Sequence, residues 1–349
     1  MYFNSCSEKK DVINPQQIDF YEEKMNLVNG LTSQDVADYL NYDVHTFSKN
    51  VRESVPNEID WSKVPSDYFQ RVLKETIEKY PDMRKENFTD DEFEFFKKAF
   101  PEFKDKQEAF VSKKHIVVDY LEIIIGKEIK KEIKNYLQKN KNLKPSNLQS
   151  YQANYNSLNP TEQSVSSNHP LGANDVNKAR TQAMAYFGTH NDNTITNAKF
   201  HAFWSAGMVK EICHTTLNKW KGLDRGKKFA TAHEYDTNNI QNCAFVANHT
   251  AVFNVRNYGL CNYMDLNNNL IGRTYMFNTV GQTWLGNANN IPSYATIYSH
   301  VNSLNSSLKN TVNGIISINP SYTLDNLGHY LNAMDYFTPT AGQLVHVAP

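Results

Sequence analysis

The 349-residue sequence has few cysteines, no long uncharged apolar run and almost no net charge. Its four cysteines form no CxxC pair, which argues against a disulfide framework or a cysteine-rich zinc site and favours small buried side chains at Cys213, Cys243 and Cys261. The most apolar stretch, residues 116–129, contains four charged residues and does not predict a membrane-spanning helix. A net charge of -1 creates no long-range field, so we expect no nucleic-acid partner.

The beginning of the chain suggests a lipid anchor. Phe3-Asn4-Ser5-Cys6, followed by a polar and charged run, resembles the end of a bacterial lipoprotein signal, although no basic or apolar segment precedes it. We expect lipidation at Cys6, a tether over residues 1–20 and membrane contact only through that lipid. This predicts a location in the cell envelope, at the outer membrane or cell surface; the alternatives are a secreted protein, or an ordinary disordered start in which the cysteine has no role.

Charge divides the chain into two halves. Of the 37 acidic residues, 27 precede residue 151. Helical periodicity over residues 88–100 and 117–137 predicts a charged helical domain at 21–138. A segment rich in Asn, Gln and Ser at 139–156 is the expected linker. A second helical domain at 157–285 and a less regular extension at 286–349 complete a mainly α fold.

Three expected helices of the second domain carry polar residues on faces that should point inward. Residues 197–208 place Asn197, His201, Trp204 and Ser205 on one face. The next helix is expected to begin with Asp224 as its cap and to end at His233-Glu234.

The third expected helix, residues 264–273, aligns Asp265 with Asn268 and sets Arg273 beside them. Asn and Gly have low helix propensity, so their presence on the inner face of this helix indicates either close packing or a site. Carboxylates are scarce after residue 150, and half of them fall in residues 211–265. The six candidate catalytic residues are His201, His233, Glu234, Asp265, Asn268 and Arg273.

The order of these motifs resembles a known family. His169-Pro170, Asn197-Ala198 with His201-Ala202-Phe203-Trp204, Ala232-His233-Glu234 and Met264-Asp265-Leu266 with Asn268-Asn269 and Gly272-Arg273 are similar to the bacterial domain-of-unknown-function family 6973. The resemblance spans about residues 157–280 and implies a domain found in secreted and toxin-like proteins, with no settled reaction. The family often has Arg where this chain has Phe200 and His where it has Asn267.

Three functions fit this set of residues. In a hydrolase, His201 and His233 with Asp265 or Glu234 would bind a divalent metal, or one histidine would act as a general base oriented by a carboxylate. Asn268 and Arg273 would then stabilise developing negative charge. No HExxH spacing supports the metal. Alternatively, the residues form a buried polar network that ties three helices together, or the domain binds a substrate or envelope partner without catalysis.

Overall fold

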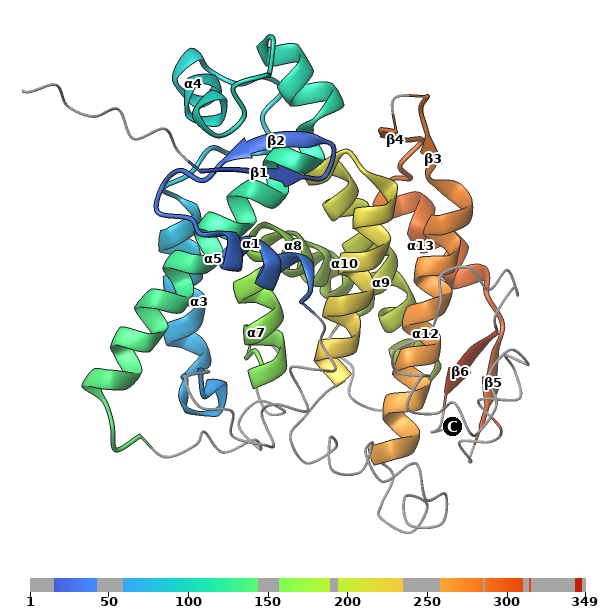
Figure 1. Ribbon diagram of the computed structural model, residues 1–349. Coiled ribbons are helices and arrows are strands. Elements are labelled where there is room, and N and C mark those ends of the chain that lie inside the picture. The colour runs from blue at the N-terminus through green and yellow to red at the C-terminus, as the bar shows by residue number, and fades with distance from the viewer. Residues whose placement is uncertain are drawn as a thin grey trace, which may run out of the picture.

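The computed structural model describes residues 16–42, 59–143, 157–188, 194–234, 258–284, 286–309, 314 and 343–346, with the backbone alone for 258–263. These residues form a mainly helical molecule with a few short strands, as expected (Figure 1). Among them no helix combines the length and apolar character needed to cross a membrane.

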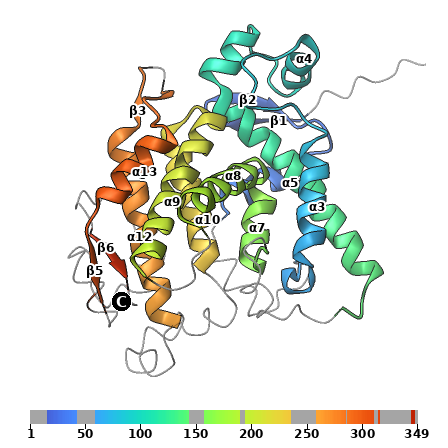
Figure 2. The same ribbon diagram turned by 180° about the vertical axis from the view of Figure 1, so that it is seen from behind.

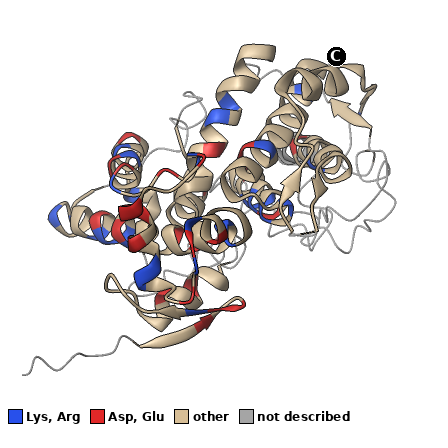
Figure 3. Ribbon diagram, turned by 90° about the horizontal axis from the view of Figure 1, so that it is seen from above, with Lys and Arg blue, Asp and Glu red and all other residues tan. Residues whose placement is uncertain are grey.

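The N-terminal half is a hairpin and a set of helices around the long helix α5. Its elements are β1 (Gln17–Phe20), β2 (Glu23–Asn26), α1 (Ser33–Leu40), the 3-10 turn η1 (Trp61–Lys63), α3 (Ser66–Ile77), α4 (Asp90–Ala99), the π-helical turn η2 (Glu108–Ser112) and α5 (Lys114–Lys139). β1 pairs antiparallel with β2, so the predicted tether over residues 1–20 is wrong at its end, where residues 17–20 are a strand. The charged residues concentrate in this half (Figure 3).

The second half is built around α9. Its elements are α7 (Pro160–Asn168), α8 (Pro170–Phe187), α9 (Ile195–Thr216), α10 (Lys219–Glu234), α12 (Tyr258–Thr279), β3 (Gly281–Gln282), β4 (Ala288–Asn289), α13 (Tyr294–Ser303), β5 (Ser306–Leu308) and β6 (Leu344–His346). Helices α8, α10, α12 and α13 all pack on α9 (Figure 2). This arrangement brings the three motif-bearing helices, α9, α10 and α12, side by side.

Small side chains allow α12 to approach α9 closely. A Cβ atom on Gly272 would lie 2.0 Å from the carbonyl oxygen of Ala202, a distance that only glycine avoids. Close packing of α12 on α9 therefore explains Gly272, and it is one of the two reasons that the low helix propensity of glycine suggested. The close approach sets Asp265, two turns earlier on α12, against α9.

The predicted extension over residues 286–349 contributes to the same core. Ile297 and Val301 of α13 and Leu344 and Val345 of β6 are buried in the cluster that contains α9 and α12. β5 and β6 pair in parallel. The described part of this extension is thus integrated with the motif-bearing helices rather than appended to them.

The two helices expected in the N-terminal half lie close to their expected places, whereas one helix of the second half begins earlier than expected. Thr89 caps α4 in a capping box with Glu92, and the helix expected over residues 117–137 extends from Lys114 to Lys139. The expected cap at Asp224 is wrong, since α10 begins at Lys219 and Asp224 lies within it. Asn218 takes that role, because its side-chain oxygen accepts a hydrogen bond from Lys221 N at 3.0 Å.

A buried charge network joins the two halves. Asp119 of α5 accepts hydrogen bonds from Lys221 and Arg225 of α10 and from Tyr21. Glu122, one turn later, lies 2.8 Å from Arg225. Both carboxylates are fully buried, and the cations beside them hold the pKa of Asp119 at about 2. We call this group of five residues the seam network.

Candidate functional site

Three side chains from three helices converge in the second half. His201 comes from the middle of α9, Glu234 from the end of α10 and Asp265 from α12. Their ligand-type atoms all lie within 4.8 Å of one another. His201 Nε2 is 3.3 Å from Asp265 Oδ1, and His201 Nδ1 is 3.9 Å from Glu234 Oε1. Three of the six predicted residues therefore form one compact cluster, which we call the triad.

The triad is buried yet incompletely hydrogen-bonded. The His201 side chain is 6 % exposed and that of Asp265 14 % exposed. His201 Nδ1 and Asp265 Oδ1 nevertheless have no hydrogen-bond partner among the described residues. Asn269, one turn after Asp265, donates weakly to Glu234 Oε1 at 3.5 Å. Buried polar atoms without partners are costly, so such a group indicates a ligand-binding role.

The electrostatics of the triad favour a bound cation. Burial lowers the pKa of His201 to about 3, with the neighbouring His233 adding to the effect. Burial also raises the pKa of Asp265 well above its usual value, and burial with the neighbouring Asp265 does the same for Glu234. A neutral imidazole and two carboxyls that resist ionisation would all be stabilised in their ligating forms by a bound cation.

The donor set fits a divalent cation. Ligand atoms bound about 2.0–2.4 Å from one ion lie no more than about 4–5 Å from one another, which the triad satisfies. One imidazole nitrogen with two carboxylates suits zinc or manganese, and coordination by oxygen alone is what magnesium and calcium prefer. Such an ion could also bind the atoms of His201 and Asp265 that have no hydrogen-bond partner.

The second predicted histidine lies beside the triad and has a different partner. The His233 ring is 6.3 Å from that of His201 between centroids. Its Nδ1 is 2.8 Å from Glu162 Oε1, and its side chain is 27 % exposed. A histidine oriented through Nδ1 by a buried carboxylate keeps Nε2 for proton exchange. His233 is therefore the more accessible histidine of the pair.

Glu162 and Asn159 belong to the site, and the sequence reasoning missed both. They form a capping box at the start of α7, in which Glu162 Oε2 accepts from Asn159 N at 2.7 Å. The Asn159 side chain donates to the carbonyl oxygens of Ala232, at 3.0 Å, and His233, at 3.3 Å. The sequence signals the capping box, since Asn-Pro-Thr-Glu has proline at the first helical position, but it does not signal the contact of the box with α10.

Asn268 and Arg273 point to other partners. Asn268 is fully buried; its amide donates to Val345 O at 2.9 Å and accepts from Val345 N at 3.0 Å, as a backbone amide in a β-ladder would. Arg273 is also buried, and it donates to Ser205 Oγ of α9 at 3.5 Å. The structure thus does not place Asn268 among the triad atoms, and it places Arg273 two turns along α12 from Asp265.

Other motif residues occupy packing positions. His169 contacts Glu122 at 3.1 Å and faces α5 rather than the triad. Phe200 is buried in the core, and the Asn267 amide donates to Gln343 O at 3.2 Å. Cys213 is a buried free thiol, as expected. Cys6 and Cys243 lie outside the described residues.

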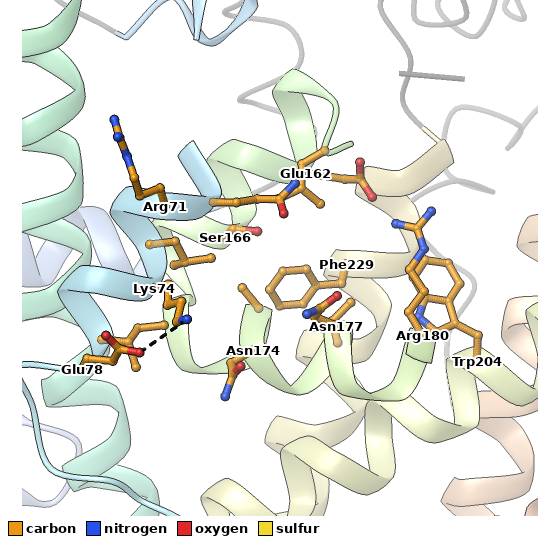
Figure 4. Close-up of a pocket in the computed structure, with 16 residues that line it drawn as sticks. Arg71, Lys74, Glu78, Glu162, Ser166, Asn174, Asn177, Arg180, Trp204 and Phe229 are labelled. Atoms are coloured by element: carbon orange, nitrogen blue, oxygen red, sulfur yellow. Dashed lines mark ion pairs between the residues drawn. The ribbon is translucent and has the colours of Figure 1, made fainter. Parts of the chain in front are cut away.

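A cavity of about 570 Å³ opens next to His233. Trp204 and Arg180 form one end of it, and Glu162 also lines it (Figure 4). The Trp204 ring is 4.9 Å from the His233 ring, and the Arg180 guanidinium lies 5.8 Å from the Trp204 ring centroid. A small molecule in this cavity would therefore lie against the residues that surround His233.

Comparison with known proteins locates this site within a family. The model of a domain of unknown function, DUF6973, matches residues 164–297. No curated protein and no solved structure matches the chain. The matched segment contains His201, His233, Glu234 and Asp265, while Glu162 precedes it by two residues. The matched segment, which runs from α7 to the middle of α13, agrees with the resemblance that the order of the motifs predicted, and we call residues 164–297 the DUF6973 domain.

Proposed function

We propose that this protein is a hydrolase whose triad, His201, Glu234 and Asp265, binds a divalent cation. The observation that carries the proposal is the convergence of three ligating side chains within 4.8 Å in a buried place where two of their atoms have no partner. Each unsatisfied buried polar atom costs about 1–3 kcal/mol, and a bound cation would offset that cost at both atoms.

The two histidines then have separate roles. His201 serves as a ligand, since it is neutral and buried, whereas His233 serves as the general base or acid, since Glu162 orients it and it is partly exposed. A bound cation would polarise the scissile bond or activate water. Asn159 would position His233 by holding the last carbonyl groups of α10.

Metal binding is tested directly by titrating the chelator-treated protein with Mn²⁺, Zn²⁺ and Mg²⁺ in a calorimeter. We expect one bound ion per chain, a higher melting temperature with the ion, and an affinity at least about 100-fold lower in His201→Ala and Asp265→Asn. His214→Ala is the matched control, because His214 is an exposed histidine on the same helix. A wild-type protein that binds none of these ions, or triad variants that bind them normally, would remove the cation from the proposal.

Hydrolysis is tested on panels of lipid, glycan and peptide substrates with the bound ion present. Glu162→Gln and His233→Gln should bind the ion but lose turnover, since they change the acid–base pair and leave the ligands intact. If the triad variants unfold while the wild-type protein neither binds an ion nor hydrolyses any substrate, the residues form a structural network instead.

We further propose that the protein acts in the cell envelope, attached through a lipid at Cys6, with secretion as the alternative. The support is the lipoprotein-like order of residues 3–6, which lies outside the described residues. The Cys6→Ser precursor, expressed with a complete export signal, should leave the membrane fraction. Unchanged fractionation would refute lipidation at this cysteine.

A further inference from the structure

The cavity beside His233 lies between the N-terminal half and the DUF6973 domain. Figure 4 shows Trp204 and Arg180 at one end, Phe229 in the middle, and Arg71 and Lys74 of α3 at the other end. Its volume of about 570 Å³ falls within the range of small-molecule sites, roughly 300–1,000 Å³. Because its walls come from both halves, its shape exists only when they are packed together.

The middle of the cavity contains an apolar strip. Aliphatic side chains from three segments form it together with the Phe229 ring, namely Leu73, Ile77, Leu158 and Val176. The polar Ser166, Asn174 and Asn177 lie around Phe229, but the strip itself offers no hydrogen-bonding group to a ligand. A hydrocarbon chain gains free energy by displacing water from such a surface.

The end of the cavity next to the site carries a buried arginine. Arg180 is 8 % exposed, and its charge helps to lower the pKa of Glu162, after the larger contributions from His233. Glu162 lines the same end, and both of its oxygens are engaged elsewhere, Oε1 with His233 Nδ1 and Oε2 with Asn159 N. An arginine can bind a carboxylate or phosphate through two parallel hydrogen bonds.

The cavity also leads to the proposed acid–base pair. Trp204 and Glu162 line it, and both contact His233, with 4.9 Å between ring centroids and a 2.8 Å hydrogen bond, respectively. A ligand whose anionic group is bound by Arg180 would therefore have the bonds next to that group beside His233.

We propose that this cavity binds an anionic amphiphile, with its carboxylate or phosphate on Arg180 and its hydrocarbon chain passing Phe229 toward α3. Such a molecule is the substrate class of the site; that identification rests on the proposed hydrolase function, whereas the binding itself does not.

The test is calorimetric titration of the full chain with four probes below their micellar concentrations: dodecanoate, dodecyl phosphate, neutral dodecyl maltoside and inorganic phosphate. We expect the two charged dodecyl compounds to bind at least tenfold more tightly than either the neutral one or phosphate alone. The relative affinities of dodecanoate and dodecyl phosphate show whether the site prefers a carboxylate or a phosphate head group. Equal affinity for dodecyl maltoside would overturn the anionic requirement, and equal affinity for inorganic phosphate would overturn the role of the chain.

Two variants locate the ligand. Arg180→Gln should weaken dodecanoate binding by about tenfold or more and leave dodecyl maltoside unchanged, since a charge-assisted contact is lost. Val176→Trp should fill the half-buried middle of the cavity and abolish binding of both dodecyl anions. Ala185→Trp, at an exposed position of the same helix outside the cavity, is its control. Normal binding by Val176→Trp, with folding verified by circular dichroism, would place the ligand elsewhere.

The Asp265→Asn variant separates this inference from the proposed function. It should bind dodecanoate normally while failing to bind the cation, because Asp265 does not line the cavity. Amphiphile binding without hydrolysis would leave the ligand inference standing and refute the hydrolase. If the protein binds the cation and hydrolyses a different substrate class but has no affinity for the amphiphiles, the hydrolase proposal stands and the ligand inference is refuted.

Discussion

At the scale of single residues, one helix face carries two kinds of polar side chain with different roles. Asp265 and Asn268 are three positions apart on α12, yet Asp265 faces His201 and Asn268 faces the backbone of β6. Asp265 has an oxygen without a partner, whereas Asn268 uses both its oxygen and its nitrogen. At these two positions of α12, Asn268 is satisfied by the scaffold whereas Asp265 keeps an oxygen that a ligand could use.

Replacing Asn268 by Ala should destabilise the protein without affecting the cation. The change removes two buried hydrogen bonds and leaves the N–H and C=O of Val345 without partners, at a cost of about 2–5 kcal/mol. Urea denaturation measures the loss, with Asn278→Ala, at an exposed position of the same helix, as the control. A variant that keeps its stability but binds Mn²⁺ more weakly would show that Asn268 serves the triad instead.

The sequence allowed part of the site to be predicted at this scale. His201 and Asp265 were identified because helical spacing places each on an inward face, and inward polar groups need partners. The same spacing could not show that α12 has two inward neighbours, α9 and β6, so it grouped Asn268 with Asp265. Glu162 was missed because its contact with His233 spans 71 residues, a separation on which local periodicity gives no information.

At the scale of elements, α7 and α10 are joined by a clamp formed by Asn159 and Glu162. Each residue closes the start of α7 with one group and holds the end of α10 with another. Helix ends leave carbonyl groups without intrahelical partners, and Asn159 supplies donors to two of them at the end of α10. The position of His233 therefore depends on the local structure of α7.

Asn159→Ala should cost more stability than the equivalent change at another capping box. Thr89→Ala, at the exposed capping box of α4, should cost about 1 kcal/mol, the usual value for a lost N-cap. Asn159→Ala should cost about 1–3 kcal/mol more, because Ala232 O and His233 O also lose a donor. Chemical denaturation of the two variants gives the comparison. Equal losses would show that the contact with α10 contributes nothing.

The helices themselves were largely predictable, while their exact starts were not. Hydrophobic periodicity located α4, α5, α9, α10 and α12 because each buries one face against a core. The start of α10 was misplaced because Asp224 and Asn218 are both good caps, and only the hydrogen bond to Lys221 N distinguishes them. β5 and β6 were not predicted, since their pairing joins residues 306–308 to residues 344–346 across a long separation.

At the scale of the whole molecule, the two halves have separate cores and a polar boundary. One cluster of buried apolar residues belongs to the N-terminal half with Leu171, and the other belongs to the DUF6973 domain with its C-terminal strand. Between them lie the seam network and a second buried group in which Arg84 contacts Asp175 and Glu211. The cavity lies along the same boundary, so its shape depends on how the two halves are joined.

The seam network predicts a specific acid sensitivity. The pKa of Asp119 falls from about 3.8 to about 2 on folding, because Lys221 and Arg225 outweigh the cost of its burial. A depressed folded-state pKa contributes stability that is fully present above pH 4 and is lost as the pH falls toward 2. At 1.36 kcal/mol per unit, this contribution is about 2–3 kcal/mol.

Asp119→Asn should remove that contribution and leave Lys221 and Arg225 without their main counter-charge. We expect a loss of about 3–5 kcal/mol at pH 7 and a difference from wild type that shrinks by about 1.5–2 kcal/mol between pH 4 and pH 2. Chemical denaturation across this pH range measures both, with Glu75→Gln, an exposed carboxylate change on α3, as the control. A difference that does not vary with pH would show that Asp119 is not ionised in the folded protein.

Because α10 carries both Arg225 and Glu234, dodecanoate binding should weaken in Asp119→Asn together with stability, as expected if the boundary between the halves shapes the cavity.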